Sequence, residues 1–316
     1  MRSAQANAPL MNRKKLGQRI YEDRWYLLFL LPAIALLFLF SYMPMYGLAI
    51  AFQDYKLGAP LIAFDGSTKW VGLDNFVNFF KSVFFNRTFG NTVRLSMKVL
   101  VFGFWVSPVV AILLNEAKNM AFKRTVQTMY YMPYFVSLAI VVSILTLLTG
   151  AAGPIGRLPE LFGGKAVNMM NSPAYFDSLY TISEIWKGFG YASILYLAAI
   201  AGVDPNLYEA VAIDGGNRMH KIIHVTVPYI LPTFAILLIL QIGNLLNTST
   251  EKILLMYNAK TMDVADVIGT YIYRVGLKDA KYSYTAAIGL FANVINFVLV
   301  FGANRLSRFL TGSSLW

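Results

Sequence analysis

The chain has 316 residues, of which 57% are apolar and 14% are charged, and it contains no cysteine. Soluble domains carry roughly 25% charged residues, so this composition argues against a soluble enzyme, a nucleic-acid-binding module and a disordered chain. The net charge of +11 fits a membrane protein with basic cytoplasmic ends better than a protein that binds nucleic acid. The absence of cysteine excludes disulfides, thiolate zinc sites and iron–sulfur clusters. The composition therefore predicts an all-α protein embedded in a lipid bilayer.

Six apolar stretches are long enough to cross a bilayer, which takes about 20 residues. Six spans place both termini on one side, and basic residues gather before the first span, so we expect both termini in the cytoplasm. We divide the chain into a cytoplasmic N-terminal segment, 1–24, and one six-helix transmembrane domain, 25–316. The six predicted spans are 25–51, 91–114, 131–149, 179–201, 228–246 and 284–304.

The cytoplasmic segment between the fourth and fifth spans, 203–228, predicts two short helices. Asp204 is a good N-cap and Pro205 suits the first helical position, while Gly215-Gly216 supplies a stop with positive φ. The first helix should contain about nine residues and measure roughly 14 Å. A second short segment leads to Pro228, where the fifth span is expected to begin. Rigid, exposed helices of this kind are suited to docking in a groove of another protein.

This segment resembles the EAA loop of importer-type ABC permeases. The family pattern is Glu-Ala-Ala, three residues, Gly, nine residues and Ile-x-Leu-Pro. This chain has Glu209-Ala210-Val211, Gly215 and Val225-Thr226-Val227-Pro228 at the same spacing, with conservative changes to valine at three positions. Further motifs resemble the carbohydrate-uptake branch that contains the maltose permeases, and within it a subgroup that imports oligosaccharides and polysaccharide fragments. These motifs are Ala198-Ala199-Ile200-Ala201-Gly202-Val203-Asp204-Pro205, Tyr42-Met43-Pro44-Met45-Tyr46-Gly47, Trp70-Val71-Gly72-Leu73-Asp74-Asn75-Phe76, Gln127-Thr128-Met129-Tyr130-Tyr131-Met132-Pro133 and Ser314-Leu315-Trp316.

The resemblance implies a type I ABC importer permease fold in the cytoplasmic membrane of a bacterium, with coupling helices between the fourth and fifth spans. It implies ATP-driven inward transport of an oligosaccharide by alternating access. The implied partners are a second homologous permease subunit, two ABC ATPase subunits and an extracytoplasmic substrate-binding protein. ATP and Mg²⁺ would be bound by the ATPase, because Gly164-Lys165 here lacks the other residues of a phosphate-binding loop. We therefore expect no enzymatic activity, cofactor or metal in this chain.

The same resemblance assigns roles to five residues of the loop. Glu209 would make the charged contact with the ATPase, Ala210 would allow close approach, and Gly215 would form the turn between the short helices. Val211 fills the third position of the motif. Asp214 would either pair with a basic residue of the ATPase or cap the second helix.

Polar residues inside spans either line a substrate path or form hydrogen bonds between helices, and the sequence supports both interpretations equally. Amides bind sugar hydroxyls, and aromatic rings stack on sugar rings. Glu184 is also close enough in sequence to pair with Lys187. The candidate path residues are Lys187 and Tyr191 in the fourth span, Gln241, Asn244 and Thr248 in the fifth, and Asn293 and Asn296 in the sixth. The outer side carries 14 basic and 10 acidic residues, a net charge of +4 that favours an acidic sugar such as a uronate oligomer.

Two other classes of protein compete with the permease. An ion-gradient-driven secondary transporter of a polar solute usually has an ionisable residue at the centre of a span, and the span centres here show no clear one. A membrane-embedded enzyme needs catalytic groups that this sequence does not offer. His220 and His224 lie four residues apart, as in some zinc sites, but no third ligand is evident. ATP dependence of transport distinguishes the permease from both alternatives.

Overall fold

The computed structural model describes residues 22–61, 68–312 and 314–315. The predicted N-terminal segment, 1–24, therefore lies almost entirely outside the described residues. The regular secondary structure of the described part is helical, apart from one isolated bridge between Gln53 and Trp70. Its α-helices are α2 (Arg24–Leu37), α3 (Asp74–Lys81), α4 (Phe85–Gly103), α5 (Val106–Asn115), α6 (Met120–Phe135), α7 (Leu138–Thr149), α8 (Pro173–Ala201), α9 (Pro205–Ile213), α10 (Arg218–Lys221), α11 (Val227–Gly243), α12 (Thr250–Met256), α13 (Met262–Ala265), α14 (Ile268–Ile272) and α15 (Tyr282–Thr311).

Six of these units can account for the six predicted membrane spans. Four continuous helical stretches in the described part are long and apolar enough to cross a bilayer, namely Arg24–Phe52, Phe85–Asn115, Arg218–Gly243 and Tyr282–Phe309. Two bent pairs raise the number to six when each counts as one span: α6 with α7, and α8 with α9. The prediction of six spans is thus confirmed, although several boundaries differ.

The third span is not the straight helix predicted at 131–149. It breaks between α6 and α7, and the two helices meet at an angle of 101°. Val136 is extended, and the side chain of Ser137 accepts a hydrogen bond from the backbone of Ile140 and so starts a new helix. Serine is a favoured N-cap. Hydropathy, from which the span 131–149 is predicted, does not detect a cap inside an apolar run.

The fifth span also begins earlier than predicted. α10, a π-helical turn at Ile222–Thr226 and α11 form one stretch, Arg218–Gly243. Pro228 lies in the first turn of α11 and does not interrupt the stretch. The second half of the segment 203–228 is therefore continuous with the fifth span.

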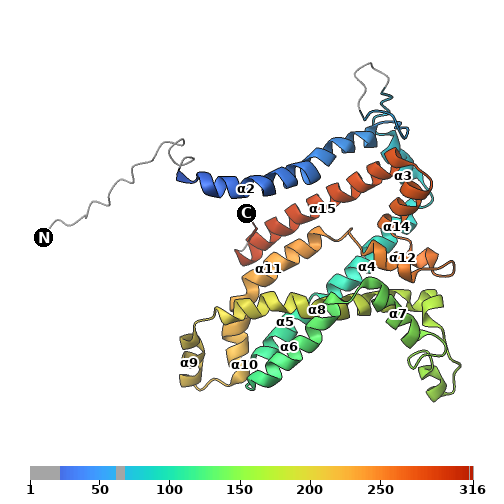
Figure 1. Ribbon diagram of the computed structural model, residues 1–316. Helices are drawn as coiled ribbons and strands as arrows, with labels where there is room; N and C mark the ends of the chain where they lie inside the picture. Colours follow the sequence, from blue (N-terminus) through green and yellow to red (C-terminus); the bar gives the residue numbers. More distant parts are fainter. Residues whose placement is uncertain (1–21, 62–67, 313, 316) are drawn as a thin grey trace.

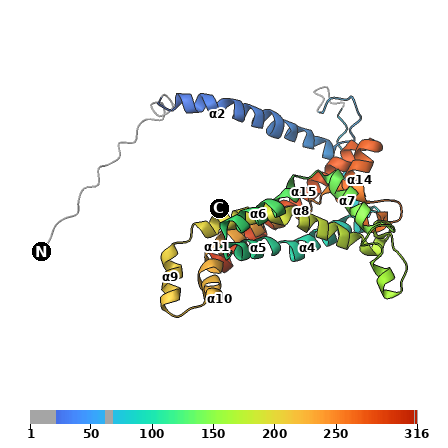
Figure 2. The same cartoon turned by 60° about the horizontal axis from the view of Figure 1, so that its bottom comes forward.

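The helices pack around α8, which contacts α4, α5, α6 and α11 (Figure 1). Gly190 permits the approach of α6, since a Cβ atom there would lie 2.0 Å from the carbonyl oxygen of Tyr130. In contrast, α2 extends away from the other helices, as Figures 1 and 2 show, and none of its residues is buried. Such an extensive apolar surface requires cover by lipid or by another protein.

Candidate functional site

The first short helix of the segment 203–228 has the N-cap and the glycine stop that its sequence predicts. The Asp204 side chain accepts a hydrogen bond of 3.0 Å from the backbone N–H of Asn206 and so caps α9. At the other end, the N–H of Gly215 donates to the carbonyl of Ala212, and the next N–H donates to the carbonyl of Val211, at 3.1 and 2.8 Å. This bonding pattern is a Schellman motif, and the φ of +78° at Gly215 explains the glycine. α9 thus has the nine residues expected.

Two tyrosine hydroxyls make hydrogen bonds beside this loop, one from α9 and one from the fifth span. The Tyr208 hydroxyl of α9 lies 3.0 Å from the Thr226 hydroxyl at the start of the fifth span. The Tyr229 hydroxyl, on the fifth span, donates a 2.7 Å hydrogen bond to the carbonyl of Gly202 at the end of α8. α9 is therefore bonded to the fifth span, which in turn is bonded to the end of α8.

The predicted coupling residues lie on the accessible surface of this loop. Glu209, Ala210, Asp214 and Gly215 are exposed, and the neighbouring Ile213 is 85% exposed. Val211 is half-buried, against Gly216. In Figure 1, α9 lies at the lower left of the molecule beside α10, at the end far from α12. An exposed, rigid helix with apolar residues next to a carboxylate has the character of a docking element.

The second short helix is capped by Asn217, and the suggestion that Asp214 caps it is wrong. The Asn217 side chain accepts from the N–H of His220, whose ring nitrogen Nδ1 accepts from the N–H of Asn217 in return, both at 3.1 Å. His220 is thereby used in a reciprocal cap. His224 Nδ1 lies 3.0 Å from the carbonyl of His220. The cap accounts for the first histidine without any metal.

Three cavities follow the outer half of the fifth span. The central cavity, of about 330 Å³, lies between α4, α5, α8 and α11, and Gln241 and Asn244 line it together with Glu184. The outer cavity, of about 80 Å³, shares these three residues and adds Thr248. A third cavity, of about 190 Å³, is lined by Thr248 and Asn293. Four of the seven predicted path residues therefore face open space along one route.

Asn296 does not line these cavities. Its side-chain oxygen accepts a 3.0 Å hydrogen bond from the backbone N–H of Leu246, just beyond the end of α11, and the residue is buried. This contact joins the fifth and sixth spans. For Asn296 the interpretation as a hydrogen bond between helices is the one that the structure favours.

Lys187 and Tyr191 are directed to the break in the third span. The Lys187 ammonium donates to the carbonyl oxygens of Tyr134 and Val136, both at 2.7 Å, and the Tyr191 ring stacks on the Tyr134 ring with centroids 4.0 Å apart. These carbonyls belong to the C-terminal end of α6, where they lack helical partners. Lys187 is the middle residue of α8. Its pairing with Glu184 is not observed, since Glu184 pairs with another lysine.

Replacing Lys187 with methionine tests this capping role. The carbonyls of α6 lose two charge-assisted hydrogen bonds, so we expect the free energy of unfolding to fall by about 1–3 kcal/mol. Thermal unfolding of the detergent-solubilised protein measures the effect. Lys118→Met, which removes an exposed lysine, is the control and should leave the midpoint unchanged. Loss of transport with an unchanged midpoint would instead support the sequence-based assignment of Lys187 to the substrate path.

Glu184 pairs with Lys252, a residue that the sequence analysis missed. The Lys252 ammonium lies 2.8 Å from Glu184 Oε1 and 5.1 Å from the centre of the Tyr180 ring. Lys252 is 0% exposed, and this burial lowers its pKa, although the charge of Glu184 opposes the shift. Lys252 belongs to α12 and is followed directly by the apolar run 253–256. These four apolar residues are the feature of the sequence that indicates the burial of Lys252.

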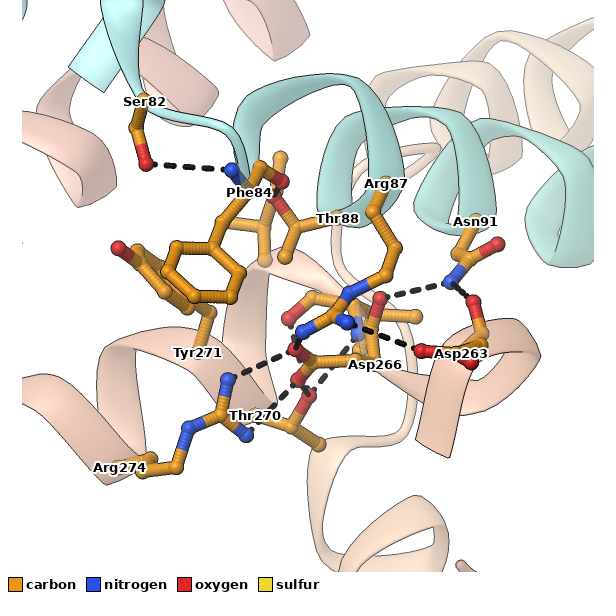
Figure 3. Close-up of polar contacts among 12 residues, drawn as sticks. Ser82, Phe84, Arg87, Thr88, Asn91, Asp263, Asp266, Thr270, Tyr271 and Arg274 are labelled. Atoms are coloured by element: carbon orange, nitrogen blue, oxygen red, sulfur yellow. Dashed lines mark hydrogen bonds and ion pairs between the residues drawn. The ribbon is translucent and has the colours of Figure 1, made fainter. Parts of the chain in front are cut away.

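A buried carboxylate joins the segment between the fifth and sixth spans to the second span. Asp266 is 0% exposed and accepts hydrogen bonds from Arg87 at 3.0 Å and from both terminal nitrogens of Arg274 at 3.1 and 2.7 Å. Figure 3 shows Arg87 on α4 reaching this carboxylate from one side and Arg274 from the other. The hydrogen bonds that Arg274 donates to Asp266 hold the pKa of Arg274 above its ordinary value. Thr270 and Asn91 add bonds to the side chain and carbonyl of Asp266.

Comparison with known proteins defines the family. Residues 100–312 match the family described as "Binding-protein-dependent transport system inner membrane component". The polygalacturonan/rhamnogalacturonan transport system permease protein YteP of Bacillus subtilis (strain 168) is 39% identical over 317 residues, covering 98% of each chain. Protein LplB of the same organism is 39% identical over 288 residues, covering 91% of this chain and 89% of LplB. The chain therefore belongs to the family of binding-protein-dependent transport system inner membrane components.

A solved structure supports the same fold. One chain in the crystal structure of a bacterial alginate ABC transporter, in complex with an alginate pentasaccharide-bound periplasmic protein, is 37% identical to this chain. The TM-score is 0.85, and the match covers 96% of this chain and 100% of the other. The expectation of a type I ABC importer permease fold is thus confirmed, and the protein is a membrane permease.

Proposed function

We propose that this chain is one permease subunit of a binding-protein-dependent ABC importer that moves a uronate-containing oligosaccharide into the cell. Proteins that are 37–39% identical over nearly the whole chain are named for polygalacturonan/rhamnogalacturonan and alginate transport, and these polymers are built from acidic sugars. The positive excess predicted on the outer side agrees with such a substrate. We assign ATP and Mg²⁺ to separate ATPase subunits, which act with a second permease and an extracytoplasmic binding protein.

The observation that carries this proposal is the exposed α9 and its link to the spans. Glu209 and Ala210 lie exposed on α9, the Tyr208 hydroxyl bonds α9 to the fifth span, and the Tyr229 hydroxyl bonds the fifth span to the end of α8. A partner that moves α9 therefore also moves α8 and α11, which line the central cavity. In this proposal α9 faces the cytoplasm, both termini lie there, and ATPase movement opens the cavity alternately to each side.

Gln241, Asn244, Thr248 and Asn293 are the proposed path residues. They line the three cavities, and their amides and hydroxyl both donate and accept hydrogen bonds, as sugar hydroxyls require. A secondary transporter would need a free ionisable group at the centre of a span. Lys187 lies on α8, but its ammonium is bonded to the carbonyls of Tyr134 and Val136. The structure therefore offers less support to the ion-driven alternative.

Uptake into proteoliposomes tests the proposed function. The chain would be co-purified with its candidate partner permease and ATPase, reconstituted, and supplied with the binding protein and labelled trigalacturonate on the outside. We expect uptake only with ATP in the lumen, and no uptake of maltotriose as the neutral control. Uptake driven by a proton or sodium gradient without ATP would overturn the proposal in favour of a secondary transporter.

A further inference from the structure

The ion pair between Lys252 and Glu184 connects the outer segment α12 to the cavities. A fully buried ammonium is costly unless it is paired and hydrogen-bonded. Lys252 satisfies this requirement with the carboxylate of Glu184 at 2.8 Å, the carbonyl of Tyr180 at 3.5 Å and the Tyr180 ring at 5.1 Å. All three groups belong to one face of α8, because residues four apart on a helix are neighbours.

Glu184 differs from Lys252 in that it reaches open space. Its side chain is 25% exposed, and it lines both the central and the outer cavity beside Gln241 and Asn244. Among the residues that line these two cavities, Glu184 alone carries a charge. A carboxylate accepts hydrogen bonds at two oxygens, so the bond from Lys252 to Oε1 leaves acceptor capacity directed to the cavity.

The position of Glu184 depends on the placement of α12. The N–H of Ser249, directly before α12, donates a 3.2 Å hydrogen bond to the Tyr180 hydroxyl. Together with the ion pair, this bond joins α12 to two successive turns of α8. Lys252 also neutralises the carboxylate from behind, and a neutral pair accepts sugar hydroxyls without repelling the carboxylates of a uronate.

We propose that Lys252 is a positioning residue for substrate selection: it holds Glu184 as the charged hydroxyl acceptor of the cavity and keeps the cavity neutral enough to admit an acidic oligosaccharide. Glu184 makes the contact with sugar, and Lys252 acts through it. This inference rests on the proposed function, since it assumes that the cavities carry a sugar.

The test uses the reconstituted complex and trigalacturonate uptake, with KM and kcat measured separately for Lys252→Met, Glu184→Gln and the double variant. We expect Lys252→Met to raise KM by about tenfold, because Glu184 is then an unneutralised anion in the path of an anionic substrate. Glu184→Gln should raise KM less. The double variant should resemble Glu184→Gln, since Lys252 then has no carboxylate to position.

Controls separate this role from a purely structural one. Lys252→Arg keeps the charge and should retain a KM within about threefold of the wild type, while Lys260→Met removes an exposed lysine and should change nothing. An unchanged KM in Lys252→Met, or a double variant whose KM rise equals the product of the single ones, overturns the inference. If Lys252→Met fails to assemble, the double variant Lys252→Arg/Glu184→Gln replaces the first double variant. Its KM is compared with those of its two single variants by the same criterion. Failure of wild-type uptake would count against the proposed function instead.

Discussion

Replacing Glu209 with lysine should abolish ATP-driven uptake and release the ATPase from the detergent-solubilised complex. Glu209 is exposed on α9 and has no ion pair within the described part of the chain, so its charge is available to a partner. Charge reversal converts an attraction across the proposed interface into a repulsion, which costs several kcal/mol. Each 1.4 kcal/mol is about a tenfold loss of affinity, so the loss should be close to complete.

Co-purification with a tagged ATPase measures this effect directly. Glu160→Lys is a matched charge reversal at an exposed residue on the opposite side of the membrane, and it should retain the ATPase. The variant and its control should have the same unfolding midpoint, because neither residue is buried. An ATPase that binds wild type and Glu209→Lys equally would remove α9 from the coupling site.

Replacing Asp266 with alanine should cause the largest loss of stability of any substitution considered for this chain. The change leaves Arg87 and Arg274 without their shared buried carboxylate. Breaking a buried ion pair by removing one partner costs about 3–5 kcal/mol. We expect a lower midpoint of thermal unfolding in detergent and faster proteolysis between the fifth and sixth spans.

Asp263 provides the control for this experiment. It pairs with the same Arg87 at 3.0 Å, but its side chain is 87% exposed, and exposed ion pairs contribute about 0–1 kcal/mol. Asp263→Ala should therefore shift the midpoint only slightly. Equal shifts for the two alanine variants would show that burial of the carboxylate is not the source of the stability.

The features that the sequence predicted well depend on neighbouring residues. The bounds of α9 follow from Asp204, Pro205 and Gly215, each of which acts within one helical turn, and the structure retains all three roles. The break at Ser137 was also local, but the apolar residues around it concealed the cap. Capping residues thus predict the ends of a helix in a polar segment. They are harder to recognise inside a long apolar stretch, where they decide whether the stretch forms one helix or two.

The features that were missed join distant parts of the chain. Lys252 and Glu184 are 68 residues apart, and Arg87 and Asp266 are 179 apart. Hydropathy and spacing describe one helix at a time and carry no information on which charges meet across helices. The same reason explains Lys187, since its partners are carbonyls that become free only after the third span bends. These contacts decide which polar residues face the cavities.

Because Arg218–Gly243 is one continuous helical stretch, the fifth span can tilt as a rigid unit. Its 26 residues correspond to about 39 Å of helix, and Gln241 lies about 35 Å along it from Arg218. A tilt of about 10° with the cytoplasmic end as pivot would move Gln241 sideways by about 6 Å, according to this length. A hinge at Pro228 would have absorbed such a motion. Without one, a small rotation at the membrane surface reaches the central cavity undiminished.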